Sequence, residues 1–510
     1  MPNTPINQAD INKTVWSACD TFRGTVDPSI YKDFVLTMLF LKYISDVRQD
    51  KIEELTAQFG DNQAMIKAML ASQSFKIPTG STFWDLYEHR FEAGNGSRID
   101  QALHAIEEEN GTKLKGVFQD ISFNTDKLGD EKQKNDILRH LLEDFGKPTL
   151  NLRPSRVGSL DVIGNAYEFL IKHFAASSGK SAGEFYTPPE VSDLLSIILE
   201  PQQGDEICDP ACGSGSLLMK CGKQIQKNFS GSKQYALFGQ EAIGSTWSLA
   251  KMNMFLHGED NHRIEWGDTI RNPKLQDANG GLLHFDVVTA NPPFSLDKWG
   301  HEDAESDHFG RFRRGVPPKT KGDYAFISHM IETLKSASSS TKGGRMGVVV
   351  PHGVLFRASS EGKIRKQLID ENLLDTVIGL PEKLFFGTGI PAAILLFKKH
   401  KTDNKVLFID ASREFKSGKN QNVLTSDNIQ KIVDTYKARE SVDKYAYLAT
   451  LEEIAENDYN LNIPRYVDTF EEEAEIDLMA VRSERLALQT ELADLELEMA
   501  GYLKELGYGA

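Results

Sequence analysis

From about residue 160 onwards, short apolar segments alternate with helical stretches, and this alternation restricts the possible fold more than any other feature. Stretches such as 246–258 and 324–336 have the apolar spacing of helices. Regular alternation of short apolar strands and helices predicts an α/β fold with a doubly wound, mostly parallel sheet. Ligands of such sheets bind outside the carboxyl ends of the strands. The expected strands are 205–210, 234–241, 284–293, 345–356, 374–381 and 392–399.

The chain on either side of this region is predicted to be helical. Residues 31–55 and 136–145 have helical apolar spacing, separated by Gly and Pro breakers. We therefore expect a helical N-terminal domain at 1–155, a catalytic α/β domain at 156–465 and a C-terminal helix at 466–510.

The last part of the chain carries a heptad pattern of apolar residues. Intervals of three and four alternate over about four repeats, which predicts a coiled-coil or partner-binding helix. A helix that packs on its own domain is the alternative. The pattern runs through Leu478, Val481, Leu488, Leu492, Leu495, Met499, Tyr502 and Leu506, with Arg485 as its one break.

Composition excludes several classes of protein. The 510 residues are 40% hydrophobic and 26% charged, as in globular proteins, and no stretch approaches the roughly 18 apolar residues of a membrane span. The N-terminus lacks the layout of a signal peptide, so we expect a cytoplasmic protein with no membrane partner. A net charge of −16 argues against a free-standing, non-specific DNA binder.

Four cysteines are too few for a disulfide framework in a chain of this length. Three of them cluster at Cys208, Cys212 and Cys221, but their spacing does not match a metal-binding motif. We expect buried, reduced thiols and no bound metal.

The stretch ICDPACGSGSLLMK, residues 207–220, joins a predicted strand to a predicted helix. Small residues let the backbone approach a ligand, and the helix start offers free N–H groups. The pattern fits neither the dinucleotide fingerprint nor the P-loop, so NAD and ATP are disfavoured. The candidate cofactor-binding residues of this turn are Asp209, Gly213, Ser214, Gly215 and Ser216.

Two acids follow later strands. Glu241 lies just past the end of the next strand, where a carboxylate can accept hydrogen bonds from both hydroxyls of a ribose. Asp268 lies in a turn after another short strand. It could accept from an adenine amino group, and the alternative is that it caps the turn.

The tetrapeptide Asn291-Pro292-Pro293-Phe294 ends the next apolar strand. The prolines cannot continue a ladder of backbone donors, so they stop the strand and hold a stiff tip. The result is a polar amide followed, after two rigid residues, by the aromatic ring of Phe294 at the end of a buried strand.

In this order the motifs resemble those of the S-adenosylmethionine-dependent methyltransferases that act on amino nitrogens, which have a Rossmann-like catalytic domain. In that class the Asn carbonyl and the first Pro carbonyl, here Asn291 and Pro292, accept hydrogen bonds from the target amine. Two fixed acceptors can stabilise the charge that develops on an exocyclic amine during methyl transfer. Adenine inside a duplex must first be flipped out, and the resemblance implies that it stacks on Phe294. The resemblance implies S-adenosylmethionine as cofactor and a catalytic role for Asn291, Pro292, Pro293 and Phe294.

The segment SAGEFYTPPEV, residues 181–191, narrows the resemblance. It is similar to the amino-terminal cofactor motif of type I restriction-modification methyltransferase subunits, which are gamma-class N6-adenine DNA methyltransferases, and the similarity spans nearly the whole chain. The resemblance implies that the motif lines the methionine part of the cofactor. The residues concerned are Glu184, Phe185, Tyr186, Thr187, Pro188 and Pro189.

The chain lacks a segment long enough to recognise a DNA sequence. The family resemblance implies double-stranded DNA as substrate, a separate specificity subunit held by two methyltransferase subunits, and a restriction (nuclease or translocase) subunit as a further partner. The loop 301–321 is basic and could contact phosphate through residues such as Arg311, Arg313 and Arg314. A protein-glutamine or RNA methyltransferase and a non-catalytic assembly module are the alternatives.

Overall fold

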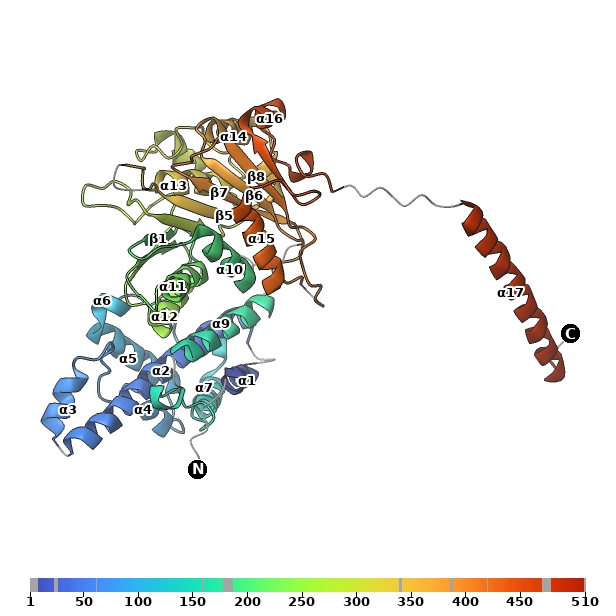
Figure 1. Ribbon diagram of the computed structural model, residues 1–510. Helices are drawn as coiled ribbons and strands as arrows, with labels where there is room; N and C mark the ends of the chain where they lie inside the picture. Colours follow the sequence, from blue (N-terminus) through green and yellow to red (C-terminus); the bar gives the residue numbers. More distant parts are fainter. Residues whose placement is uncertain are drawn as a thin grey trace. The chain divides into compact units, whose positions relative to one another are not determined.

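The computed structural model describes residues 8–22, 26–60, 62–157, 160–177, 187–338, 342–385, 389–419, 421–469 and 478–508. The chain forms two compact units, Met1–Val467 and Asp468–Ala510. The first contains a group of N-terminal helices and a large sheet, and the second contains the long helix α17 (Figure 1).

One nine-stranded sheet organises the first unit, with the strand order β3-β2-β1-β4-β5-β7-β6-β8-β9. The neighbours from β3 to β5 are all parallel, β7 runs antiparallel to both β5 and β6, and β9 is antiparallel to β8. The expected doubly wound, mostly parallel sheet is thus confirmed. Its strands are β1 (Glu206–Asp209), β2 (Ala236–Glu241), β3 (His262–Trp266), β4 (Val287–Ala290), β5 (Arg345–Pro351), β6 (Leu374–Gly379), β7 (Ala392–Lys398), β8 (Lys405–Asp410) and β9 (Ala446–Thr450).

All six expected strand segments form strands, but each strand is shorter than its apolar segment. Strands β8 and β9 were not predicted. Strand β9 lies at the edge of the sheet, and only two of its five residues are buried. A half-exposed edge strand carries a weak apolar signal, so its sequence resembles that of a loop.

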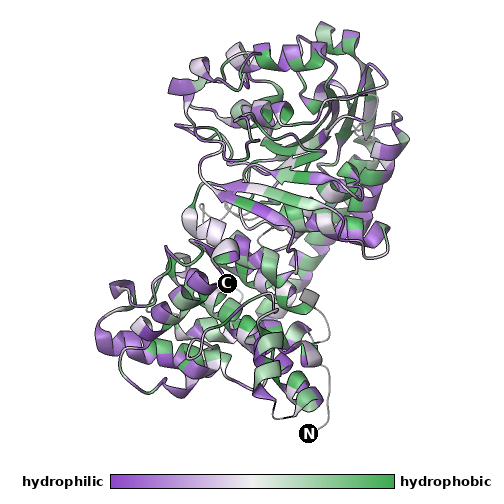
Figure 2. Cartoon of the chain, turned by 90° about the vertical axis from the view of Figure 1, so that its left-hand side faces the viewer, coloured by the Kyte–Doolittle hydropathy of each residue, from purple (hydrophilic) through white to green (hydrophobic). Residues whose placement is uncertain are grey.

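Alternate residues of each strand face two separate cores. Val287 belongs to the core that contains Ile207 and Leu237, whereas its neighbour Val288 belongs to the core that contains Cys208. This period of two is what an extended chain requires. Figure 2 shows the hydrophobic strands enclosed by helices whose outward sides are largely hydrophilic.

Helices cover both faces of the sheet. The first core includes side chains of α10 (Pro189–Leu199), α11 (Ser216–Asn228), α12 (Gly244–Leu256) and α15 (Ser426–Ala438). The second core includes side chains of α13 (Asp323–Glu332), α14 (Ser359–Asp370) and the short α16 (Leu451–Glu456). This three-layer arrangement is the one expected for parallel strands joined by crossover helices.

The N-terminal helices continue the first core without interruption. Helix α12 contacts both α2 and α9, so the helical group packs directly on the helices of the sheet (Figure 1). The group consists of α1 (Gln8–Ala18), α2 (Pro28–Phe59), α3 (Gln63–Leu70), α4 (Phe83–Glu88), α5 (Asn95–Glu109), α6 (Gly111–Leu114), α7 (Glu131–Phe145), α8 (Pro154–Val157) and α9 (Leu160–Ser177). The helices expected at 31–55 and 136–145 are confirmed as parts of α2 and α7, while the domain limits at 155 and 465 stay predictions.

A buried ion pair ties α2 to later segments of the helical group. Lys42 donates to Asp46 one turn further on and to the carbonyl of Leu150, 3.0 Å away. Asp46 also accepts from Trp84 Nε1 at 3.0 Å and from the backbone N–H of Leu152 at 2.8 Å. Burial lowers the pKa of Lys42, and the charge of Asp46 partly offsets that effect.

The second unit contains α17 (Leu478–Glu505), a continuous helix as predicted. Its apolar heptad residues are exposed, and no described residue of this unit covers them. Whether the helix pairs with a partner stays a prediction. Among the described residues, none of the helices is both long enough and apolar enough to cross a membrane.

We expect the Lys42→Ala variant to lose about 3–5 kcal/mol of unfolding free energy, because it leaves the Asp46 carboxylate buried without a cation. Urea unfolding followed by circular dichroism measures the loss. Lys51→Ala is the matched control on the same helix, since the Lys51–Glu54 pair is exposed and its removal costs about 1 kcal/mol or less. Equal losses in the two variants would contradict a stabilising role for the buried pair.

Candidate active site

Four predicted site residues lie at the same edge of the sheet. Because β3, β2, β1 and β4 are adjacent and parallel, their carboxyl ends lie side by side. The strand order reverses between β1 and β4, and this is the position where open α/β sheets bind ligands. The residues at or just beyond these strand ends are Asp268, Glu241, Asp209 and Asn291.

The glycine turn between β1 and α11 has the backbone geometry that its sequence requires. Gly213 and Gly215 have φ values of 54° and 82°, in the left-handed region that glycine adopts at little cost. A Cβ atom on Gly215 would lie 2.6 Å from Cε of Met254 on α12, so the end of that methionine side chain would have to move. The carbonyl of Ser214 accepts from Asn253 Nδ2 at 2.9 Å, and Ser216 is the first residue of α11.

Glu241 connects this turn to the end of β2. Its two carboxylate oxygens accept from the backbone N–H groups of Gly213, at 3.0 Å, and Ile243, at 2.9 Å. The side chain is buried, and burial raises its pKa although these hydrogen bonds act in the opposite direction. Each oxygen retains a lone pair for a further donor.

Asp209, at the end of β1, is a second buried acid. Burial raises the pKa of its carboxyl to about 8, and the nearby charge of Glu241 adds to the rise. The N–H group of Ala211 donates to it at 2.9 Å and partly offsets that rise. Two desolvated carboxyls at one edge form an acceptor-rich site suited to a ligand with hydroxyl or amino donors.

Asp268 caps its own turn, which is the alternative that the sequence left open. It accepts from the N–H groups of Ile270 and Arg271, at 2.8 and 3.0 Å, and its side chain is 40% exposed. A hydrogen bond from Asp268 to an adenine amino group stays a prediction.

Asn291 follows the last residue of β4, and its amide group has a single partner. Its Nδ2 donates to Oγ1 of Thr187 at 3.2 Å. Its Oδ1 is buried and has no hydrogen-bond partner among the described residues. A buried amide oxygen without a donor is costly, so this atom is a ready acceptor for a donor on a ligand.

The rest of the tetrapeptide places an aromatic ring beside this acceptor. Pro292 is buried, whereas Pro293 and Phe294 are partly buried. The ring of Phe294 meets that of Phe385 edge to face, with centroids 5.8 Å apart and an interplanar angle of 64°. In such a contact the edge of one ring meets the face of the other, so Phe385 covers at most one face of the Phe294 ring.

The predicted cofactor segment is described only in part. Glu184, Phe185 and Tyr186 lie outside the described residues. Pro188 precedes α10 and Pro189 begins it, which is a favoured position for proline. Thr187 lies beside Asn291, so the structure brings the two motifs together.

The structure argues against phosphate contacts by two arginines of the loop 301–321, Arg311 and Arg314, because both are buried, whereas the side chain of Arg313 is 52% exposed. Arg314 is almost fully buried and donates to Glu332 and Glu371, which also pair with Arg313. Arg311 is also buried; it pairs with Asp307 and donates to the carbonyls of residues 269 and 270. These guanidinium groups hold the loop on its own domain.

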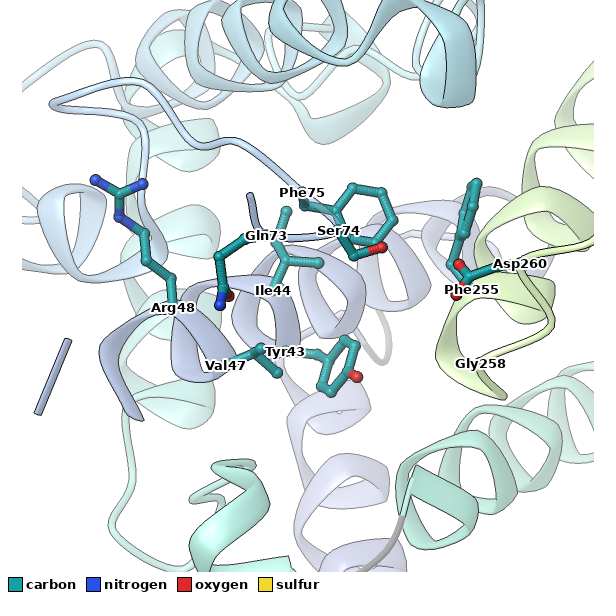
Figure 3. A pocket seen from close by; sticks show the side chains of 10 residues that line it. All are labelled: Tyr43, Ile44, Val47, Arg48, Gln73, Ser74, Phe75, Phe255, Gly258 and Asp260. Atoms are coloured by element: carbon teal, nitrogen blue, oxygen red, sulfur yellow. The ribbon is translucent and has the colours of Figure 1, made fainter. Parts of the chain in front are cut away.

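A separate pocket of about 140 Å³ lies among α2, residues 73–75 and the segment that follows α12 (Figure 3). Its aromatic residues Phe75 and Phe255 meet edge to face, with centroids 5.0 Å apart. None of the predicted site residues lines it, and it is smaller than the 300–1,000 Å³ typical of ligand sites. We therefore place the candidate active site at the edge of the sheet.

Among the described residues, no group of three or more His, Cys, Asp or Glu side chains could hold a metal ion. The four cysteines are buried, as predicted, and none forms a disulfide. Burial raises the pKa of the Cys208, Cys212 and Cys221 thiols.

The sheet and the motifs at its edge define a class of protein. A strand that ends in Asp-Pro is followed by the glycine turn, an acid ends the neighbouring strand, and the Asn-Pro-Pro-Phe tip follows β4. These are the features of S-adenosylmethionine-dependent methyltransferases that act on amino groups. Residues 158–475 match the family model N-6 DNA Methylase and residues 11–145 match the HsdM N-terminal domain, so the chain belongs to the methylase subunits of type I restriction-modification systems.

Individual relatives agree with this assignment. The chain is 31% identical to the type I restriction enzyme MpnII methylase subunit of Mycoplasma pneumoniae, over 97% of this chain and 96% of that protein. It is 34% identical to the MjaVIII methylase subunit of Methanocaldococcus jannaschii, over 96% of this chain and 83% of that protein. A crystal structure of the type I methyltransferase subunit from Streptococcus thermophilus matches with a TM-score of 0.80 and 36% identity, over 91% of this chain and 100% of that chain.

The family assignment confirms several expectations from the sequence. The protein is an adenine-specific DNA methyltransferase that uses S-adenosylmethionine, with a catalytic α/β region and a helical N-terminal region. The match to a DNA methylase model over most of the chain favours DNA over the protein-glutamine and RNA substrates that were the alternatives.

The hydrogen bond between Thr187 and Asn291 was not predicted from the sequence, because the two residues are far apart in the chain.

We expect Thr187→Val to lower kcat for methyl transfer about tenfold, because Asn291 loses the acceptor that orients its amide. Thr187→Ser should stay close to wild type. Transfer of radiolabelled methyl groups to DNA measures both variants.

The matched control for this substitution is Thr289→Val in β4. Thr289 is fully buried, and its hydroxyl has no hydrogen-bond partner among the described residues, so the isosteric change should leave kcat unaltered. Equal rates for Thr187→Val and wild type would show that Thr187 does not orient Asn291.

Proposed function

We propose that residues 291–295, which we call the amine-acceptor loop, bind the N6 amine of a flipped-out adenine. The observation that carries this proposal is the buried Oδ1 of Asn291, which has no hydrogen-bond partner in the described part of the chain. Thr187 occupies the Nδ2 side of the same amide, so the oxygen is the atom left for a ligand. The carbonyl of Pro292 is the second acceptor, and the two prolines keep both acceptors in place.

Two carbonyl acceptors suit the chemistry of an aromatic amine. The nitrogen lone pair is delocalised into the ring, so the free amine is a poor nucleophile. Hydrogen bonds from both N–H groups to Asn291 Oδ1 and the Pro292 carbonyl favour a tetrahedral nitrogen and stabilise the positive charge that develops on it. The acceptors are preorganised, so little rearrangement is needed as the charge appears.

The strand-end residues fit S-adenosylmethionine, which when bound supplies a methyl group from a positively charged sulfur. Glu241 is held by two backbone N–H groups and retains lone pairs for ribose hydroxyls. Burial raises the pKa of Asp209, so hydrogen bonds from the cofactor's amino or hydroxyl groups would stabilise the charged form of its carboxyl. Gly213 and Gly215 allow the turn to approach the cofactor closely.

Phe294 supplies the contact for the base itself. An adenine extruded from the duplex loses its stacking neighbours, and an aromatic ring replaces part of that interaction. Its edge-to-face contact with Phe385 fixes the orientation of the ring and covers at most one of its two faces.

The chain is proposed to act on double-stranded DNA within a larger assembly. Its net charge is −16, and the arginines of the loop 301–321 are paired within the protein, so DNA affinity must come largely from partners. A specificity subunit, a second copy of this chain and a restriction subunit are the partners that we propose. The exposed heptad seam of α17 is the surface proposed to bind the specificity subunit.

We expect Asn291→Ala to lower kcat for adenine methylation by about 100-fold to 1,000-fold, because it removes one of two acceptors for the developing charge. Affinity for S-adenosylmethionine should change less than threefold. Isothermal titration calorimetry measures the affinity, and mapping of N6-methyladenine in DNA measures the product. Loss of cofactor affinity with unchanged kcat would reject the assigned role.

We expect the isolated chain to methylate duplex DNA poorly and the co-purified assembly to methylate it at specific sites. A double substitution on the heptad seam, Leu488→Asp with Leu495→Asp, should abolish co-purification of the specificity subunit, because two charges enter an apolar seam. Leu497→Asp is the control, since Leu497 is also exposed on the same helix but lies off the seam. Robust site-specific methylation by the chain alone would contradict the proposed assembly.

A further inference from the structure

The chain turns back sharply directly after Phe294. Ser295 has a φ of 53°, in the left-handed region that residues other than glycine rarely adopt. Its backbone N–H donates to Oδ1 of Asp323 at 2.8 Å, and the next carbonyl, of Leu296, accepts from the N–H of Gly322 at 3.0 Å. The amine-acceptor loop is thus attached at two adjacent points to the start of α13.

Asp323 is itself held in place by a buried ion network. It is the first residue of α13, and its side chain is almost fully buried. Its second oxygen accepts from Nη2 of Arg357 at 2.8 Å, and Nε of Arg357 lies 3.0 Å from a carboxylate oxygen of Glu361 on α14. The Asp323 carboxylate therefore contacts the amine-acceptor loop with one oxygen and Arg357 with the other.

We infer that Asp323 is a positioning residue for methyl transfer, which holds Ser295 in its left-handed conformation and so fixes how the amine-acceptor loop presents the Pro292 carbonyl and the Phe294 ring. This inference rests on the proposed function of the loop. An unusual backbone conformation persists only where surrounding contacts enforce it, and Asp323 provides such a contact directly.

The rest of the helix can remain in place without this carboxylate. Helix α13 is anchored independently by apolar packing, because its side chains Tyr324, Ile327 and Ile331 are buried in the second core. Arg357 retains Glu361 as a partner when Asp323 is removed. The side chain of Asp323 therefore has a local role that substitution can isolate.

The test uses the full-length chain co-purified with its specificity subunit. We expect Asp323→Ala to lower kcat by about 100-fold, as for a misplaced catalytic group, with KM for DNA and affinity for S-adenosylmethionine within about threefold of wild type. Adding Ser295→Gly to this variant should recover about tenfold of the loss, because glycine adopts a φ of 53° without a side-chain contact. A merely structural role for Asp323 would not be rescued in this way.

Controls separate the possible outcomes. Asp297→Ala removes an exposed acid two residues after Ser295. The Asp297 carboxylate accepts from the N–H group of Lys298 in its own turn, so its loss should leave kcat unchanged. Where Asp323→Ala does not fold, Asp323→Asn replaces it. The neutral amide oxygen is a weaker acceptor than the carboxylate, so we expect kcat to fall about tenfold. Adding Ser295→Gly should again reverse this fall. Wild-type kcat for the Asp323 variant, or no recovery with glycine, overturns the inference. Retained activity in Asn291→Ala overturns the proposed function of the loop instead.

Discussion

The parallel register of β3, β2, β1 and β4 is the constraint on which the rest of the site depends. Parallel strands end at the same edge of a sheet, so residues separated by dozens of positions in the chain become neighbours there. Asp209, Glu241 and Asn291 each lie at such an end. The reversal of strand order between β1 and β4 provides the place where a cofactor and a target base can meet.

The polar groups at this edge differ in how many of their possible hydrogen bonds are formed. Glu241 is held by two backbone donors, Asp209 is buried with a raised pKa, and Asn291 retains an oxygen without a donor. By contrast, the buried arginines Arg311 and Arg314 of the same unit are paired with carboxylates. A ligand bound at this edge can supply the hydrogen bond that Oδ1 of Asn291 lacks among the described residues.

Much of the fold could be predicted because its signals are local. Six apolar segments of six to twelve residues identified β1, β2 and the strands from β4 to β7, and the glycines of the turn predicted the left-handed backbone at Gly213 and Gly215. Strands β8 and β9 were missed. The basic composition of residues 301–321 was misleading, since sequence alone does not show that Arg314 is buried against Glu332 and Glu371.

The sequence by itself determined the chemistry available to this protein: an amide and an aromatic ring beside two prolines, a glycine turn and strand-end acids. Only the tertiary structure decided how these groups are held. Thr187 orients Asn291 from 104 positions away, and Asp323 binds Ser295 from 28 positions away. Such partners cannot be inferred from local patterns, because a hydrogen bond requires two atoms within about 3 Å, and that proximity arises only when the strands and helices have packed.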